Sequence, residues 1–342
     1  MHKVLITGAT GFIGSHVVRL FSEKGVKIGC LVRKNSDLAN IKDLPVELKY
    51  GDITNLQGLR QSFKGFDFVI HIAAYVHDWG NYDVFYKTNV IGTLNVLQSS
   101  YDNNINNIII TGSISVYGEE DSKIIKDENS PYNSHYPYFG DKIFPSKFNF
   151  YRDTKTIAKK EAIKFATEHN LNMTIIEPVW VYGEREFNTG FFEYIKTVKT
   201  GIPFFPGSKK NKFHVVYARD LARAYWLAFQ KKLIGINSFI IGNEKVEQMD
   251  KIFSLFCQEA GLKKPKILHK FIVYPIGFFG ELFYTILGMK NPPLLTRNRV
   301  NLFYDNIEYS TLKAKTLLGF TNLYSLEEGI KKTVAWYKEQ KL

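Results

Sequence analysis

A tyrosine and a lysine four residues apart are the residues of this chain best suited to acid–base chemistry. Tyr151 and Lys155 stand in the segment YRDTK, and Ile157, Ala158 and Ala162 continue a helical apolar pattern. This spacing places both side chains on one helix face, a turn apart. A phenol alone titrates near about 10, and an adjacent ammonium favours its ionised form. The pair is therefore a candidate for moving a proton to or from a substrate oxygen near neutral pH.

A hydroxyl group follows a predicted strand upstream of this pair. Ile108–Ile110 begin the segment IIITGSISVYG, which carries Ser113 and Ser115. A hydroxyl at a strand end can donate to a substrate oxygen and stabilise charge as it develops there. Ser115 is the alternative to Ser113, and we expect it to point to the other side of the segment. Either serine could instead cap the next turn.

The chain begins with the element that would place a cofactor beside these groups. Val4, Leu5 and Ile6 form an apolar strand pattern, three glycines follow in TGATGFIG, and a helical pattern comes next. A strand, a glycine-rich turn and a helix in this order are typical of dinucleotide binding. Gly8 allows the tight turn, Gly11 lets the backbone approach a pyrophosphate, and Gly14 lets the helix pack on the sheet. The alternative is the same turn without a ligand.

Strand and helix patterns alternate through the first half of the chain. Further strands are predicted at 27–32, 46–50, 68–74 and 173–179, and a helix at 89–99. This alternation predicts an α/β fold, a Rossmann-type doubly wound parallel sheet. Ala73 and Ala74 would end one strand with side chains small enough for a cofactor to lie over them.

The pattern is less regular after Gly183. Helices are predicted at 191–198 and 249–260, strands at 213–216 and 239–241, and a further helix around Asp220–Leu227. We expect a nucleotide-binding domain over 1–183 and a smaller C-terminal substrate lobe over 184–342, with later returns to the core. Residues 119–149 show no period and separate the serines from Tyr151, so we expect them to border the substrate.

The end of the second strand bears on the choice of cofactor. It reads Leu31-Val32-Arg33-Lys34, with no acid before Asp37. An acid at this point usually binds the ribose 2′-hydroxyl of NAD, whereas an arginine accommodates the 2′-phosphate of NADP. Arg33 therefore favours NADP(H), with NAD(H) as the alternative.

These motifs resemble the extended branch of the short-chain dehydrogenase/reductase superfamily, the NAD-dependent epimerase/dehydratase group. The resemblance implies that the catalytic hydroxyl is Ser113, three residues before Val-Tyr-Gly, that Lys155 holds the nicotinamide ribose, and that Asn89 in NVIGT supports the site. It places Asp52 and Ile53 at the adenine ring. The implied cofactor-binding set is Gly8, Thr10, Gly11, Phe12, Ile13, Gly14, Arg33, Asp52, Ile53, Ala73, Ala74, Thr111, Tyr151, Lys155, Pro178 and Val179.

Differences within the family indicate a branch. Sugar-nucleotide dehydratases carry Asp-Glu after the catalytic hydroxyl, where this chain has Ile114-Ser115, and epimerases usually have an arginine where it has Glu177. The segments PPLLTRNRV, YSTLKAKTLLGF and SLEEGIKKTVAWY resemble the 3β-hydroxysteroid dehydrogenase and dihydroflavonol reductase branch, which handles bulky apolar alcohols and ketones.

Three functions remain open at this stage. The first is an NADP(H)-dependent oxidoreductase of a bulky apolar keto or hydroxy compound, with Tyr151 as acid and base. The second is a nucleotide-sugar epimerase with tightly bound NAD. The third is a cofactor-bound regulatory protein without turnover, which the intact set of Ser113, Tyr151 and Lys155 disfavours.

The composition limits the remaining possibilities. The formal net charge is +12, but no nucleic-acid-binding signature accompanies it. Lysine pairs such as Lys159-Lys160 are interpreted as solvated, with binding of an anionic lipid or an anionic cofactor as the alternative. Cys30 and Cys257 are too few and too far apart for a disulfide framework or a zinc site, so we expect no metal. No signal peptide precedes the first strand, so a cytoplasmic location is expected. A homodimer is an expectation by family analogy alone.

Residues 271–289, FIVYPIGFFGELFYTILGM, are the most apolar stretch. Three interpretations are open: a helix that lines an apolar pocket, a surface anchor at a membrane, and a membrane span. Pro275, Gly277, Gly280 and Glu281 disfavour the span. Two interpretations are also open for the aromatic residues of the long loop: contact with an apolar substrate, or packing between the lobes. These residues are Tyr132, Tyr136, Tyr138, Phe139 and Phe144.

Overall fold

A seven-stranded parallel sheet forms the centre of the computed structural model, which describes residues 2–118, 124–187 and 189–340. The strand order is β11-β6-β5-β4-β1-β2-β3. The order reverses between β1 and β4, the switch point where such sheets bind ligands at the carboxyl ends of their strands. The strands are β1 (Lys3–Thr7), β2 (Lys27–Val32), β3 (Glu47–Tyr50), β4 (Phe68–His71), β5 (Asn107–Thr111), β6 (Asn172–Pro178) and β11 (Ile236–Ile241). The predicted Rossmann-type sheet is confirmed.

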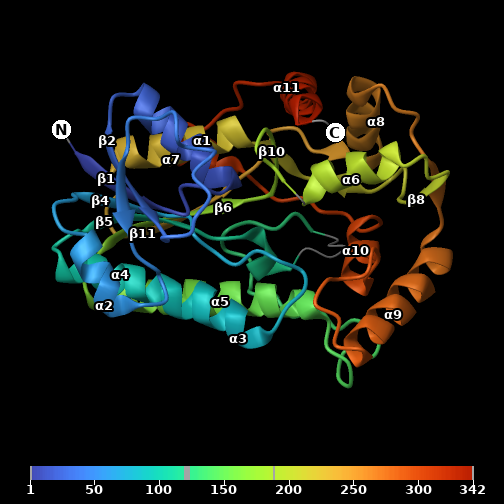
Figure 1. Ribbon diagram of the computed structural model, residues 1–342, viewed down its shortest axis with the longest axis horizontal. Helices are drawn as coiled ribbons and strands as arrows, with labels where there is room; N and C mark the ends of the chain where they lie inside the picture. The colour runs from blue at the N-terminus through green and yellow to red at the C-terminus, as the bar shows by residue number, and fades with distance from the viewer. Residues whose placement is uncertain (1, 119–123, 188, 341–342) are drawn as a thin grey trace.

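Helices cover both faces of this sheet (Figure 1). On one face lie α1 (Phe12–Glu23) and α7 (Ala218–Lys231), and on the other lie α2 (Leu56–Ser62), α4 (Gly92–Asp102) and α5 (Lys147–Glu168). Side chains alternate across the strands, so Val4 and Ile6 pack into one core while Leu5 packs into the other. Burial on both faces explains why these strands read as continuous apolar runs.

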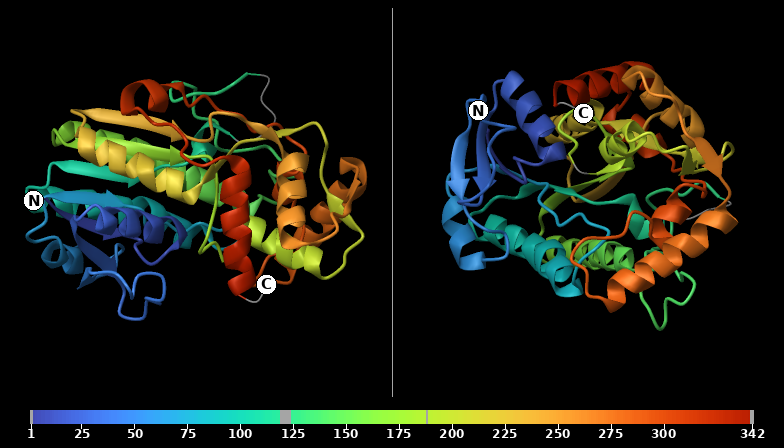
Figure 2. Two further views of the ribbon diagram at one scale, coloured as in Figure 1. Left: turned by 90° about the horizontal axis from the view of Figure 1, so that it is seen from above. Right: turned by 45° about the vertical axis from the view of Figure 1, so that its right-hand side comes forward.

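Most of the elements that follow β6, apart from α7 and β11, form a C-terminal lobe (Figure 2). It contains the strand pairs β10-β7, β12-β9 and β13-β8. Its strands are β7 (Trp180–Tyr182), β8 (Phe204–Pro206), β9 (Lys212–Phe213), β10 (Val215–Tyr217), β12 (Glu247–Gln248) and β13 (Lys266–Leu268), and its helices are α6 (Gly190–Lys199), α8 (Met249–Ala260), α9 (Lys270–Ile286), α10 (Arg297–Leu302) and α11 (Leu326–Glu339). The core on the α1 side of the sheet continues into this lobe through Phe191 and Phe256.

Several predicted boundaries shift in the structure. The strand predicted over 68–74 ends at His71, so Ala73 and Ala74 lie beyond it. The helix predicted over 89–99 begins earlier, with α3 (Tyr82–Phe85) and the π-helical turn η1 (Tyr86–Ile91) running into α4. The strand predicted over 213–216 is divided between β9 and β10. Residues 119–123 of the predicted loop lie outside the described residues, and α5 begins within it at Lys147.

Residues 270–286 form the single helix α9 despite the internal Pro275. In the part of the chain that the structure describes, no helix is long and apolar enough to cross a bilayer. The span interpretation of 271–289 is therefore wrong, and the other two remain. Cys30 and Cys257 are buried and unbridged, and no three His, Cys, Asp or Glu residues gather as metal ligands within the described ranges.

Candidate functional site

The glycine-rich turn after β1 has the shape that a dinucleotide requires. Gly8 has a φ of +70°, and the Gly11 amide donates to its carbonyl at 3.1 Å. A Cβ on Gly14 would lie 2.0 Å from the Gly8 oxygen, so only glycine lets α1 pack this close. No side chain caps α1 at Gly11, which leaves its first amides available to an anion. The turn therefore fits a pyrophosphate.

Lys155, one of the predicted catalytic residues, lies at the carboxyl end of β5. Lys155 reaches from α5 across to the end of β5, where its Nζ donates to the Thr111 carbonyl at 2.7 Å. Ser113 follows two residues later, and Tyr151 lies partly exposed one turn before Lys155 on the same helix. Lys155 is deeply buried, and loss of hydration lowers its pKa to about 8. An ammonium that titrates this close to neutral pH can respond to a proton transfer beside it.

The two serines are not on opposite sides. Residues Ile114–Tyr117 form a 3₁₀ turn, η2, instead of an extended segment. The Ser113 and Ser115 hydroxyls lie 2.7 Å apart, and Ser113 Oγ also accepts from the Ser115 amide at 3.2 Å. The expectation that Ser115 points away from Ser113 is wrong. Residues two apart lie on the same side even of an extended segment, and here the 3₁₀ turn brings the two hydroxyls together. Ser113 both caps this turn and remains beside the end of β5.

Asn89 links the π-helical turn to the catalytic helix. Its amide group donates to the Tyr75 carbonyl and its oxygen accepts from the Tyr75 amide, at 3.2 and 2.8 Å. It also donates to Thr154 Oγ1 at 3.3 Å, and Thr154 precedes Lys155. Asn89 is buried and thus positions α5 from behind. No signal in the sequence identified the role of Thr154, although it lies between Tyr151 and Lys155.

The predicted adenosine end lies beyond β2 and β3. Arg33 is exposed there, and Asp52 holds the Thr54 amide and hydroxyl at 2.8 Å each. Burial opposes ionisation of Asp52, but the Thr54 hydrogen bonds and the Arg33 charge outweigh it and lower its pKa. Ile53 packs where a Cβ on Gly92 would lie 2.8 Å from it. The Arg33 charge therefore acts on Asp52, and the role of Arg33 at a ribose stays a prediction.

The remaining predicted cofactor residues surround the same sheet edge. The Ala73 amide donates to Thr7 Oγ1 at 3.2 Å, directly over Gly8. Thr111 Oγ1 is 2.6 Å from the Tyr225 hydroxyl. The others are Thr10, Phe12 and Ile13 at the start of α1, Ala74 after β4, Pro178 at the end of β6, and Val179, which is buried in the core.

A buried ionic cluster behind the site was missed. Lys159 Nζ donates to Glu177 Oε1 at 2.8 Å, Tyr117 donates to Glu177 Oε2 at 2.8 Å, and Lys159 lies 2.7 Å from the Tyr117 oxygen. The interpretation of Lys159 as solvated is wrong, since it is 4% exposed. Its spacing of four from Lys155 was the available signal, because it puts both lysines on one face of α5. Loss of hydration raises the pKa of Glu177, while Lys159 opposes this.

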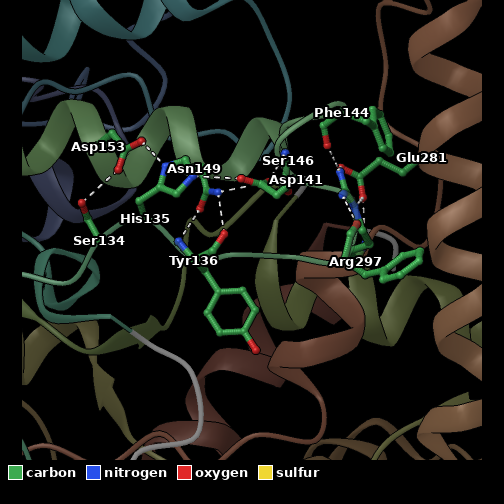
Figure 3. Close-up of polar contacts among 11 residues, drawn as sticks. Ser134, His135, Tyr136, Asp141, Phe144, Ser146, Asn149, Asp153, Glu281 and Arg297 are labelled. Carbon is green, nitrogen blue, oxygen red and sulfur yellow. Dashed lines mark hydrogen bonds and ion pairs between the residues drawn. The ribbon is translucent and has the colours of Figure 1, made fainter.

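The long loop is tied to the start of α5 (Figure 3). His135 bridges Asp153 and Asp141 at 2.8 and 2.9 Å, and these two hydrogen bonds, chiefly that to Asp153, raise its pKa. Asn149 exchanges hydrogen bonds with the Tyr136 backbone at 3.1 and 2.9 Å. The loop before Tyr151 is thus held to α5 by the side chains of Asn149 and Asp153, which the irregular sequence alone did not indicate.

Comparisons with known proteins identify the family of this chain. A family model described as the NAD dependent epimerase/dehydratase family matches residues 4–242. Sterol-4-alpha-carboxylate 3-dehydrogenase erg26, decarboxylating, of Schizosaccharomyces pombe is 26% identical, with 100% of this chain and 99% of the relative covered. N-acetyl-alpha-D-glucosaminyl-diphospho-ditrans,octacis-undecaprenol 4-epimerase of Escherichia coli O157:H7 is 27% identical over 98% of this chain and 95% of its own. The crystal structure of gox2253 superimposes with a TM-score of 0.81 at 26% identity, with 99% of each chain covered.

Proposed function

Because this chain belongs to the NAD dependent epimerase/dehydratase family, whose enzymes act on CH–OH groups, we propose that it is an NADP(H)-dependent oxidoreductase of a bulky apolar keto or hydroxy compound. The observation that carries the proposal is the position of Lys155, which spans from α5 to the end of β5 at Thr111. This bond brings the helix that bears Tyr151 to the strand that is followed by Ser113.

Each group then has a defined role. A bound nicotinamide supplies or accepts the hydride. Tyr151 gives its phenolic proton to the carbonyl oxygen in reduction, and takes it back from the alcohol in oxidation. The Lys155 ammonium favours the phenolate that remains, and Ser113 donates a hydrogen bond to the same substrate oxygen. Asn89 keeps α5 in place through Thr154.

The choice of substrate class has support from two sides. The first relative is named for a sterol, a large apolar molecule with a hydroxyl group. The loop that leads to Tyr151 also carries aromatic side chains such as Tyr132 and Tyr136, which would suit such a substrate. Arg33 supports NADP(H), because no acid follows β2 at the position that would bind a ribose 2′-hydroxyl.

A sugar epimerase with tightly bound NAD is the second candidate. The 4-epimerase relative favours it, with a similar identity to that of the sterol enzyme. Such an enzyme needs the same Ser113, Tyr151 and Lys155 set. Glu177, where epimerases of this resemblance usually carry arginine, weighs against it.

One assay separates the two. Purified protein is mixed with NADPH or NADH and a 3-oxo steroid, and in parallel with a UDP-hexose without added cofactor. We expect consumption of NADPH with the ketone, and a loss of about 10²- to 10⁴-fold in Tyr151→Phe. Interconversion of the UDP-hexose, with NAD released only on denaturation and no turnover of steroid ketones, would replace the proposal by the epimerase.

A further inference from the structure

The outward face of α9 is entirely apolar. This helix runs along the outer edge of the C-terminal lobe (Figures 1 and 2). Its exposed large residues, which we name the α9 ridge, are Phe271, Ile272, Ile276, Phe279, Phe283, Ile286 and Leu287. Ile286 is 73% exposed and Phe271 is 75% exposed. Contiguous exposed apolar patches of this kind mark interaction surfaces.

The inner face of α9 explains why the ridge points outward. Val273, Gly277 and Glu281 are buried at a spacing of four. A Cβ on Gly277 would lie 3.0 Å from Val300 in α10, so the two helices pack closely along this line. Glu281 is the one charged residue on the inner face, and it fixes the rotation of the helix. The ridge is therefore the opposite face of a fixed helix.

A buried arginine joins α9 to the loop beside the catalytic helix (Figure 3). Arg297 donates to both oxygens of Glu281, at 2.9 and 3.0 Å, and is itself fully buried. The same guanidinium donates to the carbonyls of Phe139 and Phe144 at 2.7 and 2.9 Å. Phe139 on this loop packs against Phe278 of α9, with ring centroids 5.4 Å apart. Phe139 and the nearby Ile143 are 70% and 94% exposed, so they extend the apolar surface of the ridge. Arg297 thus holds the helix and the loop tip as one preformed surface.

The exposed charged side chains within the two segments that carry this surface, residues 270–296 and 136–150, are positive. Between residues 270 and 296 the sequence has one acid, Glu281, which is buried. Between 136 and 150 it has one, Asp141, which is 8% exposed and bonded to His135. Lys142 and Lys290 are exposed at the two edges. The surface therefore combines an apolar centre with a cationic rim.

We propose that the α9 ridge, with Phe139 and Ile143, binds the surface of an anionic phospholipid bilayer. An amphipathic helix of this kind lies parallel to the membrane with its apolar face about 5–10 Å deep, and lysines at the rim meet anionic headgroups. A second copy of the chain is a poorer occupant, because a two-fold contact through one ridge would bring the lysine rims together without an acid to pair them. This surface does not depend on the redox proposal.

Vesicle flotation of the full chain tests the proposal. Phosphatidylcholine vesicles with and without phosphatidylglycerol are compared at low and high salt. We expect binding to the anionic vesicles that weakens with salt. Phe279→Ser/Phe283→Ser should reduce the partition coefficient at least tenfold, whereas the matched control Ile234→Ser/Leu323→Ser, on exposed apolar residues elsewhere, should not change it. Each of Lys142→Gln and Lys290→Gln should weaken binding by about fivefold on anionic vesicles, as expected for one lysine near such a surface.

The fluorescence of a dye on a single substituted cysteine provides the second measurement. Cys30 and Cys257 are buried, so an environment-sensitive dye on Ile276→Cys labels the ridge alone. A blue shift with anionic vesicles supports insertion. The proposal is overturned if the wild type does not float and the dye does not shift. It is also overturned if sedimentation shows a dimer that Phe279→Ser/Phe283→Ser dissociates while vesicle binding is unchanged.

Discussion

The hydroxyls of Ser113 and Ser115 lie 2.7 Å apart, within the same turn after β5. Only one of them is at the edge of the fold, since Ser113 is 8% exposed and Ser115 is fully buried. Ser115 can therefore orient Ser113 but has little access to a substrate. The contributions of the two hydroxyls to kcat can therefore be measured separately by replacing each serine.

We expect Ser113→Ala to lower kcat by about 10²- to 10³-fold, the usual effect of removing one donor to a developing oxyanion. Ser115→Ala should cost less than about tenfold, because it removes only a partner of that donor. Steady-state kinetics measure both, with a ketone that the NADPH assay identifies as a substrate, and circular dichroism checks the fold. A larger loss in Ser115→Ala than in Ser113→Ala would reverse the assignment.

Lys155 predicts an alkaline limit to activity. Burial lowers its pKa to about 8, so it is charged below this pH and neutral above it. We expect kcat/KM for ketone reduction to fall as pH rises through about 8, since this parameter reports the pKa values of the enzyme before substrate binds. In Lys155→Arg the residual activity should keep its value to higher pH, because arginine stays charged. An unchanged limit in that variant would assign the titration to another group, Tyr151 first.

The buried pair of Lys159 and Glu177 should matter for stability. Lys159→Met leaves the Glu177 carboxylate without its ammonium in a site that excludes water. Removal of one partner of a buried pair costs about 3–5 kcal/mol of the free energy of unfolding. Urea unfolding measures this, with the exposed neighbour Lys160→Met as the control, for which we expect a change within about 0.5 kcal/mol. The double variant Lys159→Met/Glu177→Met should lose less free energy of unfolding than the two single variants lose together. Fully additive losses would argue against a coupled pair.

Arg33 should decide between the two cofactors. Arg33→Ser is expected to lower kcat/KM for NADPH by about 10- to 100-fold, which corresponds to one hydrogen bond to a charged group. Its kcat/KM for NADH should change by less than about threefold, because no 2′-phosphate is present to bind. Lys34→Ser is the control at the adjacent exposed position. Equal losses with both cofactors would mean that Arg33 does not read the 2′-position.

Local sequence was sufficient wherever a short motif controls its own backbone. The turn from Gly8 to Gly14 has the predicted geometry, because a positive φ and a close approach of two backbones each require glycine. The parallel sheet followed from apolar runs that alternate with helical patterns. The spacing of Tyr151 and Lys155 placed both on α5, since the period of a helix is a local property.

Long-range packing decided the rest. The sequence of Ser113 to Tyr117 does not reveal that this segment forms a 3₁₀ turn. Lys159 of α5 is buried because the fold places Glu177 of β6 against it. The outward direction of the α9 ridge depends on Glu281 meeting Arg297, sixteen residues away on α10. A periodic pattern reports how side chains are distributed around one element. Which face is buried is settled by the partner that the fold brings to it.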